Sequence, residues 1–338
     1  MYSRALDPTT VIDEPPTTEE PDGPRPVRAQ PGRLDRVYRG VASAAGLLTF
    51  ALMGLVAFFL LTRGRPAFET MGWRFFTTSQ WLPDSSNPTF GVAALLYGTF
   101  VVAVIANVLA VPVSVATALY IVEYAPRRFR ASLTALVDLL AAVPSLIFGI
   151  WGLLYLTPKM FGLGRWLDIW LGPILFPFDA DGDTYAGSLF IAGVVVAVMA
   201  VPIMTSVCRE VFSQAPRVEC EGALALGGTR WGMIRAVVLP FGRGGIIGGS
   251  MLAVGRALGE TIAIALVLRP STRIVTRILD EGGSTVASHI ALTFPEASDF
   301  GVRALLAAGL TLFAVTLVVN MAASAVVARS RSGAGVEL

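Results

Sequence analysis

Residues 243–268 indicate what kind of protein this is, and they read RGGIIGGSMLAVGRALGETIAIALVL. The stretch is long enough to cross the hydrocarbon core of a bilayer, which takes about 20 apolar residues. Arg256 and Glu260 lie inside it, and charges at such a depth are costly unless they face a partner, a cavity or a solute path. The stretch therefore predicts a membrane-spanning helix that carries functional charges.

The composition of the whole chain also favours a membrane protein. Its 338 residues are 54% hydrophobic and 15% charged, whereas soluble domains carry roughly 25% charged residues. A net charge of +2 leaves no excess of cations for binding nucleic acid. Two cysteines and one histidine exclude a disulfide framework and a zinc site built from His and Cys. The single lysine, Lys159, is not part of a phosphate-binding loop, so we expect no ATP site of that kind in this chain.

Six stretches of the chain are apolar and long enough to span a membrane. They lie near residues 41–62, 91–122, 131–157, 187–209, 243–268 and 303–328. We therefore predict an all-α membrane protein with six transmembrane helices. Arginines concentrate in the short loops that follow the second and fourth stretches, from Arg127 to Arg130 and from Arg209 to Arg243. Because positive loops stay in the cytoplasm, both termini are predicted to be cytoplasmic.

The two ends of the chain differ in composition from the apolar part. Residues 1–32 are rich in proline and acidic residues and poor in apolar ones, so we predict a disordered cytoplasmic tail. Residues 33–330 are predicted to form one transmembrane domain. Residues 331–338 are expected to be a short cytoplasmic C-terminus.

Arg256 and Glu260 are the candidates for a solute-binding site. We expect one helix to continue from about 243 to 268, and residues four apart then lie on one face and can pair. The planar fork of arginine matches tetrahedral oxyanions, and a nearby carboxylate keeps an anion from binding too tightly to leave. A buried ion pair that only fixes helix packing is the alternative. Asp138 and Asn320 are weaker candidates for an intramembrane polar role.

Glycines in the same stretch predict close helix packing. Small residues four positions apart let helix backbones approach each other in lipid. The predicted packing residues are Gly245, Gly249, Gly255 and Gly259.

The loop between the fourth and fifth stretches contains a second signal. Residues 221–227 read EGALALG, and residues 237–240 read VVLP. A short helix from about 216 to 225, ended by the glycines at 227 and 228, would present Glu221 and Ala223 to the cytoplasm.

This loop resembles the docking loop of binding-protein-dependent ABC importer permeases. That loop reads Glu-Ala-Ala, three residues, Gly, nine residues, Ile, one residue, Leu-Pro. The spacing is intact here, with Gly222 in place of the first alanine and Val237 in place of isoleucine. A coupling helix near 216–227 follows from the resemblance.

Other segments resemble permeases of the phosphate-specific transport system. The segment GRALGET at 255–261 is shared with both permease types of that system. Features similar to the PstC type, rather than to the PstA type, are Trp81-Leu82-Pro83, Phe90-Gly91, Leu96-Tyr97-Gly98-Thr99, Pro144-Ser145 with Gly149, and Ile262-Ala263 after the shared Gly-Glu-Thr. The resemblance covers about residues 33–330.

The resemblance implies the architecture of a type I ABC importer permease and assigns roles to residues. It places Arg256, Glu260, Thr261 and Ser145 along the substrate path. It places Glu221, Gly222, Ala223, Gly227, Leu239 and Pro240 at the contact with an ATPase. The chain would then be a transport subunit in the bacterial cytoplasmic membrane and not an enzyme, with no catalytic residue, metal or cofactor of its own.

The resemblance also implies partners. They are a second permease of the PstA type, a dimer of an ATPase of the PstB type that binds ATP and Mg²⁺, an extracytoplasmic phosphate-binding protein of the PstS type, and inorganic phosphate.

Three other functions are alternatives to phosphate import. A permease for sulfate, molybdate or phosphonate would use the same arginine fork. A gradient-driven carrier would be expected to have acids in several spans, whereas only Asp138 and Glu260 are available. A membrane-embedded enzyme would need a nucleophile, a base or a metal cluster, and His289 alone does not supply one.

Overall fold

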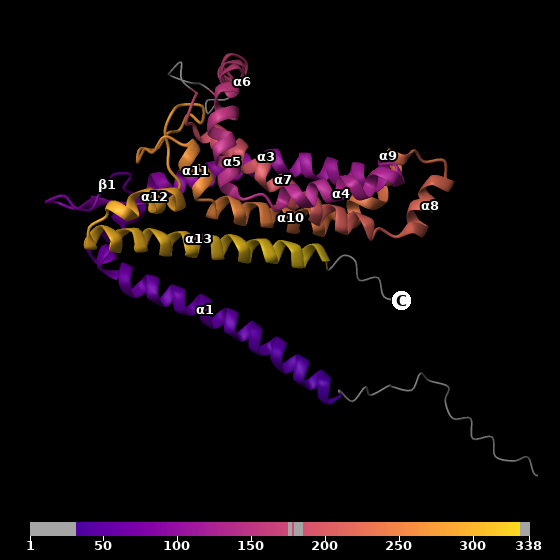
Figure 1. Cartoon of the computed structure of the whole chain (residues 1–338), viewed down its shortest axis with the longest axis horizontal. Coiled ribbons are helices and arrows are strands. Elements are labelled where there is room, and N and C mark those ends of the chain that lie inside the picture. Colours follow the sequence, from indigo (N-terminus) through magenta and orange to yellow (C-terminus); the bar gives the residue numbers. More distant parts are fainter. Residues whose placement is uncertain (1–31, 175–177, 179–184, 332–338) are drawn as a thin grey trace, which may run out of the picture. The chain divides into compact units, whose positions relative to one another are not determined.

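The computed structural model describes residues 32–174, 178 and 185–331 (Figure 1). The predicted disordered tail, residues 1–32, lies outside the described residues except for Gly32, and so does the C-terminus from residue 332. By its contacts the chain divides into two units, one ending at Met53 and the other beginning at Gly54. In the first unit the described residues form the N-terminal half of helix α1 (Arg33–Met71), where the side chains from Leu34 onward are exposed.

Six helical segments of the described chain are long and apolar enough to cross a membrane. They are Leu34–Met71, Ala93–Tyr124, Ser145–Leu171, Leu189–Ser213, Arg230–Gly259 and Asp299–Ala325. The prediction of an all-α membrane protein with six spanning helices is confirmed. The orientation of the termini stays a prediction.

The centre of the second unit is built from α3 (Ala93–Leu119), α7 (Leu189–Ser213) and α10 (Leu239–Gly259). Helices α3 and α7 run in parallel, because Ile105 contacts Gly193 and, further along, the Ser114 hydroxyl donates to the carbonyl of Val201 at 3.1 Å. Alanines and valines of the three helices form a buried core. Small side chains allow this close approach, which supplies packing contacts where lipid gives no hydrophobic drive.

Helix α10 runs antiparallel to α7. A Cβ atom at Gly242 would lie 2.3 Å from the Phe212 ring, and one at Gly245 would lie 2.5 Å from Val211. Helix α13 (Asp299–Arg331) packs along α10, and α4 (Arg127–Ala141) packs on α7 (Figure 1).

The remaining elements are short. They are α2 (Arg74–Thr77), β1 (Trp81–Leu82), β2 (Thr89–Phe90), η1 (Tyr120–Tyr124), α5 (Ser145–Trp151), η2 (Gly152–Leu156), α6 (Thr157–Leu171), α8 (Arg217–Ala225), α9 (Arg230–Met233), η4 (Ile234–Val238), α11 (Ile262–Val267), α12 (Val286–Thr293) and η5 (Phe294–Glu296). Strands β1 and β2 form an antiparallel hairpin in which Trp81 pairs with Phe90. Segments η1, η2 and η4 are π-helical, which is a frequent feature of helices near functional sites.

The third predicted stretch, 131–157, is not one helix. Helix α4 ends at Ala141, and Pro144 stands as the N-cap of α5 in an extended conformation. The break agrees with the bias of proline against continuing a preceding helix. The run of the described chain that meets the criteria for a span is Ser145–Leu171, whereas α4 is amphipathic and has no buried residue.

His289 of α12 is buried against the hairpin. Its ring meets the Trp81 ring edge to face with centroids 4.8 Å apart, and neither its Nε2 nor Trp81 Nε1 has a hydrogen-bond partner among the described residues. Burial lowers the pKa of His289 to about 4. His289 is therefore a neutral core residue that packs against the hairpin.

Candidate functional site

The predicted continuous helix over 243–268 is broken at Glu260. Helix α10 ends at Gly259, Glu260 is extended with φ −68° and ψ 128°, and α11 begins at Ile262. The side chains at the break satisfy backbone groups that it leaves free. The Ala263 N–H donates to Glu260 Oε1 at 3.4 Å, and the Thr261 hydroxyl donates to the carbonyl of Gly259 at 3.1 Å. Glu260 therefore has a capping role that the sequence did not indicate.

Arg256 lies in the last turn of α10 and pairs with Glu260. Arg256 Nη2 is 4.0 Å from Glu260 Oε2, and the side chains are 34% and 7% exposed. Arg256 Nε is buried and has no hydrogen-bond partner among the described residues. A guanidinium has five N–H donors. The long ion pair leaves these donors available for a further acceptor, as binding of an oxyanion requires.

Ser145 is the first residue of α5, and Thr261 is the N-cap of the neighbouring α11. A Cβ atom at Gly149 of α5 would lie 2.8 Å from Ala263 Cα, and one at Gly152 would lie 3.2 Å from Val267. The two contacts show that α5 and α11 run in parallel. Ser145 is one turn before Gly149, so it lies at the level where α10 breaks, near Glu260 and Thr261.

The four predicted packing glycines fall into two groups. Gly245 and Gly249 face Val211 and Met204 of α7, where a Cβ would approach to 2.5 and 3.2 Å. A Cβ at Gly255 would touch only Asn320 Oδ1, at 3.9 Å, and one at Gly259 would meet no atom within 4 Å among the described residues. A packing role for these last two stays a prediction that requires another chain.

Helix α8 is a short helix at one end of the bundle. We call this end, which includes η1 and residues 217–238, the coupling end, after the role predicted for α8. Helix α8 spans Arg217–Ala225, and Gly227 follows with φ +83°, a left-handed conformation that favours glycine. The Gly228 N–H donates to the carbonyl of Ala223 at 3.2 Å and completes the C-cap. Glu221 and Gly222 are exposed, whereas Ala223 is half-buried against η4.

Exposed apolar side chains accompany the polar motif of α8. Val218 is 83% exposed and Leu226 is 91% exposed. Apolar side chains on a rigid surface stub are typical of protein-protein contacts. Leu239 and Pro240 lie elsewhere, where η4 passes into α10.

Arginines fasten the coupling end to the bundle. Arg130 Nη2 donates to the carbonyl of Val122 at 2.5 Å, and Arg230 Nη1 donates to that of Glu123 at 3.1 Å. Both carbonyls belong to the π-helical end of the second span. A polar cavity of about 300 Å³ lies beside them, lined by residues that include Arg130, Arg217, Cys220 and Glu221. Burial, and after it the carboxylates of Glu123, Glu219 and Glu221, raise the pKa of the Cys220 thiol.

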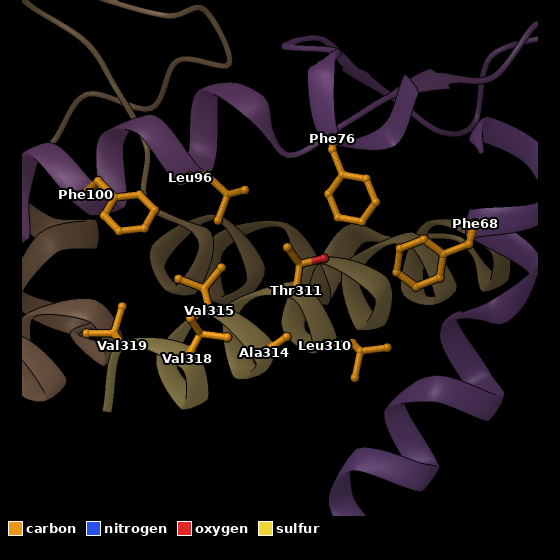
Figure 2. Close-up of a pocket in the computed structure, with 10 residues that line it drawn as sticks. All are labelled: Phe68, Phe76, Leu96, Phe100, Leu310, Thr311, Ala314, Val315, Val318 and Val319. Atoms are coloured by element: carbon orange, nitrogen blue, oxygen red, sulfur yellow. The ribbon is translucent and has the colours of Figure 1, made fainter. Parts of the chain in front are cut away.

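A groove along α13 is apolar and offers nothing to an anion. It has a volume of about 490 Å³ and is lined by Phe68, Phe76, Leu96, Phe100, Leu310, Thr311, Ala314, Val315, Val318 and Val319 (Figure 2). The Thr311 hydroxyl, its polar group, donates to the carbonyl of Ala307 on its own helix. The groove is not part of the candidate path.

Sequence reasoning missed a second charged cluster, between α4 and α7. Arg209, expected in a cytoplasmic loop, lies inside α7, where its Nη2 is 3.7 Å from Asp138 Oδ1. The Ser206 hydroxyl donates to the same Asp138 oxygen at 2.7 Å. The signal that could have indicated this cluster is Asp138, because a carboxylate in an apolar stretch requires a partner.

The family model described as "Binding-protein-dependent transport system inner membrane component" matches residues 110–332. The chain belongs to this family. It is a multi-pass component of the cytoplasmic membrane that serves a transport system and is not an enzyme. The matched range includes the broken fifth span, both charged clusters and helix α8.

Relatives of this permease chain match over nearly their whole length. Two proteins named "Phosphate transport system permease protein PstC 2", from Mycobacterium bovis and Mycobacterium tuberculosis, are each 44% identical, over 89% of this chain and 93% of theirs. "Phosphate transport system permease protein PstC" of Mycobacterium leprae is 42% identical, over 87% and 93%. The predicted resemblance to the PstC type is confirmed.

A solved structure shares the permease fold. It is "Crystal structure of bacterial alginate ABC transporter in complex with alginate pentasaccharide-bound periplasmic protein", with a TM-score of 0.53 and 18% identity, over 86% of this chain and 95% of that chain. The expected type I ABC permease architecture is thus supported by both sequence and fold.

Proposed function

We propose that this chain is one of two permease subunits of an ATP-driven importer of inorganic phosphate. Its partners are a second permease of the PstA type, an ATPase dimer of the PstB type that binds ATP and Mg²⁺, and an extracytoplasmic phosphate-binding protein of the PstS type. The names of its relatives support the substrate class.

The observation that carries the proposal is the guanidinium of Arg256. It lies where the fifth span breaks, it is one-third exposed, and its Nε has no partner among the described residues. Glu260 holds it from one side without satisfying all of its donors. Oxyanions accept parallel hydrogen bonds from such a fork, and the fixed carboxylate limits the affinity so that the anion can leave.

The coupling residues divide into those that face a partner and those that shape the loop. Glu221 and Gly222, with the exposed apolar side chains of α8, form the surface that the ATPase contacts. Gly227 fixes the end of α8, and Leu239 and Pro240 begin α10, so movement of α8 is passed directly to the helix that carries Arg256.

Arg256→Gln tests the proposal in the complete complex reconstituted into liposomes with its binding protein. We expect ATP-dependent uptake of radiolabelled phosphate to fall at least about a hundredfold, because two charge-assisted hydrogen bonds are lost. Co-purification of the subunits is expected to be unchanged, since the Ala263 N–H still binds Glu260. Arg243→Gln is the matched control, because Arg243 is an exposed arginine of the same helix.

Wild-type uptake that needs no ATP would favour the gradient-driven carrier. Sulfate, molybdate or phosphonate could compete with radiolabelled phosphate as strongly as unlabelled phosphate does. That result would favour another oxyanion as the substrate. Uptake by Arg256→Gln at the rate of Arg243→Gln would contradict the path assignment.

A further inference from the structure

The cluster between α4 and α7 joins four polar side chains from two helices. Arg209 Nη1 donates to the Thr134 hydroxyl at 3.2 Å, and Arg209 Nη2 is 3.7 Å from Asp138 Oδ1. Ser206 donates to the same carboxylate oxygen. The cluster thus combines a guanidinium, a carboxylate and two hydroxyls, which is the chemistry of the Arg256 site with added hydroxyl groups.

The guanidinium of Arg209 is not saturated by these neighbours. The separation of 3.7 Å from Asp138 is too long for a hydrogen bond. Arg209 Nε is buried and has no hydrogen-bond partner among the described residues. A guanidinium that served only to clamp two helices would be expected to bind the carboxylate through two short bonds. Most of its five donors are instead left for a further acceptor.

The cluster is open to a ligand. The Asp138 side chain is 51% exposed and that of Arg209 is 24% exposed. Helix α4, which supplies Thr134 and Asp138, has no buried residue. The described part of this chain therefore leaves that face of the cluster uncovered.

The two arginines lie at different depths on the way to the coupling end. Gly245 of α10 meets Val211 of α7, and Gly249 meets Met204 and Val207. Continued along the antiparallel helices, this register places Arg256 level with about residue 199 of α7. Arg209 is about ten residues further along, which is roughly 15 Å closer to the coupling end. An anion that moves from Arg256 toward the coupling end would therefore pass the level of Arg209.

We propose that Arg209, with Thr134, Ser206 and Asp138, forms a second oxyanion-binding station on the coupling-end side of Arg256. This inference rests on the proposed function and assigns to it a further binding site. The anion takes the free guanidinium donors and the hydroxyls, and Asp138 displaces it again by re-pairing with Arg209.

Uptake by two Arg209 variants tests the station. Arg209→Gln removes the charge, whereas Arg209→Lys keeps the charge opposite Asp138 and loses the planar fork. We expect both to lower phosphate uptake about tenfold or more, with Arg243→Gln unchanged. If Arg209→Gln fails to assemble, Arg209→Lys decides. Arg209→Lys transporting at the wild-type rate would overturn the proposal, because a helix clamp needs only the charge.

A labelling experiment detects phosphate at the station directly. Ala131→Cys lies on the face of α4 that carries Thr134 and Asp138, and Leu136→Cys lies on the opposite face. Both are made in a Cys220→Ser background, where the remaining Cys208 is fully buried. We expect inorganic phosphate to slow maleimide labelling of Ala131→Cys several-fold in the complex, to leave Leu136→Cys unaffected, and to lose its effect when Arg209→Gln is added.

The two proposals fail in different ways. Absence of ATP-dependent phosphate uptake by the wild-type complex, or normal uptake by Arg256→Gln, counts against phosphate import itself. A different set of results would reject only the second station. In that case the wild-type complex imports phosphate normally, Arg256→Gln abolishes this uptake, and phosphate does not change the labelling of Ala131→Cys.

Discussion

Glu260 has two functions that can be separated chemically. Its carboxylate pairs with Arg256, and its Oε1 accepts the N–H that begins α11. A glutamine keeps an oxygen for the cap and removes the charge. On the proposed function, the charge opposes an incoming anion, whereas the cap maintains the helix break.

We therefore expect Glu260→Gln to bind phosphate more tightly and to release it more slowly. In reconstituted transport the KM should fall several-fold and the maximal rate should fall about tenfold, because the repulsion that returns the anion to solvent is lost. The kinetics of uptake against phosphate concentration measure both. A raised KM with an unchanged maximal rate would contradict this account.

His289 makes the stability of the hairpin end dependent on pH. Its pKa falls from 6.5 to about 4 on folding, so protons bind the unfolded state more readily. Stability is then highest above about pH 6.5 and is lost as the pH falls toward 4, by roughly 2 kcal/mol at about pH 5. We expect His289→Leu to flatten the difference between unfolding midpoints measured at about pH 7 and at about pH 5. If the unfolding midpoint of the variant falls between about pH 7 and about pH 5 by as much as that of the wild type, other groups cause the effect.

At the scale of elements, α8 is a surface stub connected to α10 through a short turn, α9 and η4. Thr229 caps α9, and π-helical η4 leads without interruption into α10. A force applied to α8 therefore reaches the fifth span through the turn at residues 226–229 and then along a helix without a break from Arg230 to Gly259.

Reversing the charge of α8 should uncouple ATP hydrolysis from substrate. We expect Glu221→Lys to reduce the stimulation of ATPase activity by the loaded binding protein to near the basal rate, because the exposed carboxylate no longer matches its partner surface. Glu296→Lys, in exposed η5 between α12 and α13, is the matched charge reversal. Full stimulation in Glu221→Lys would argue against a coupling role for this residue.

The sequence predicts elements well where the signal is local. The apolar spans and the glycine-terminated α8 each depend on consecutive residues. The break of the fifth span was missed because it contains neither glycine nor proline at residues 260 and 261, and its cap comes from a glutamate that also resembles an intramembrane charge. The break before α5 was signalled by Pro144.

At the scale of the whole molecule, long-range pairs could not be predicted. Ser206 and Asp138 are 68 residues apart in the chain, and nothing near either one indicates the other. Arg256 and Glu260 were predicted as partners because they are one turn apart. From the residues themselves the candidate site was therefore one local pair, the family resemblance added Thr261 and Ser145, and the structure adds the cluster that requires the fold.

Helix α4 is joined to α7 by hydrogen bonds to Asp138 and Thr134, and none of its residues is buried. A subunit synthesised without its companion would leave this helix, with the half-exposed Asp138 in its last turn, outside the assembled complex. On the proposed function, we therefore expect chain made in excess of its companion permease to be degraded faster than chain in the complex.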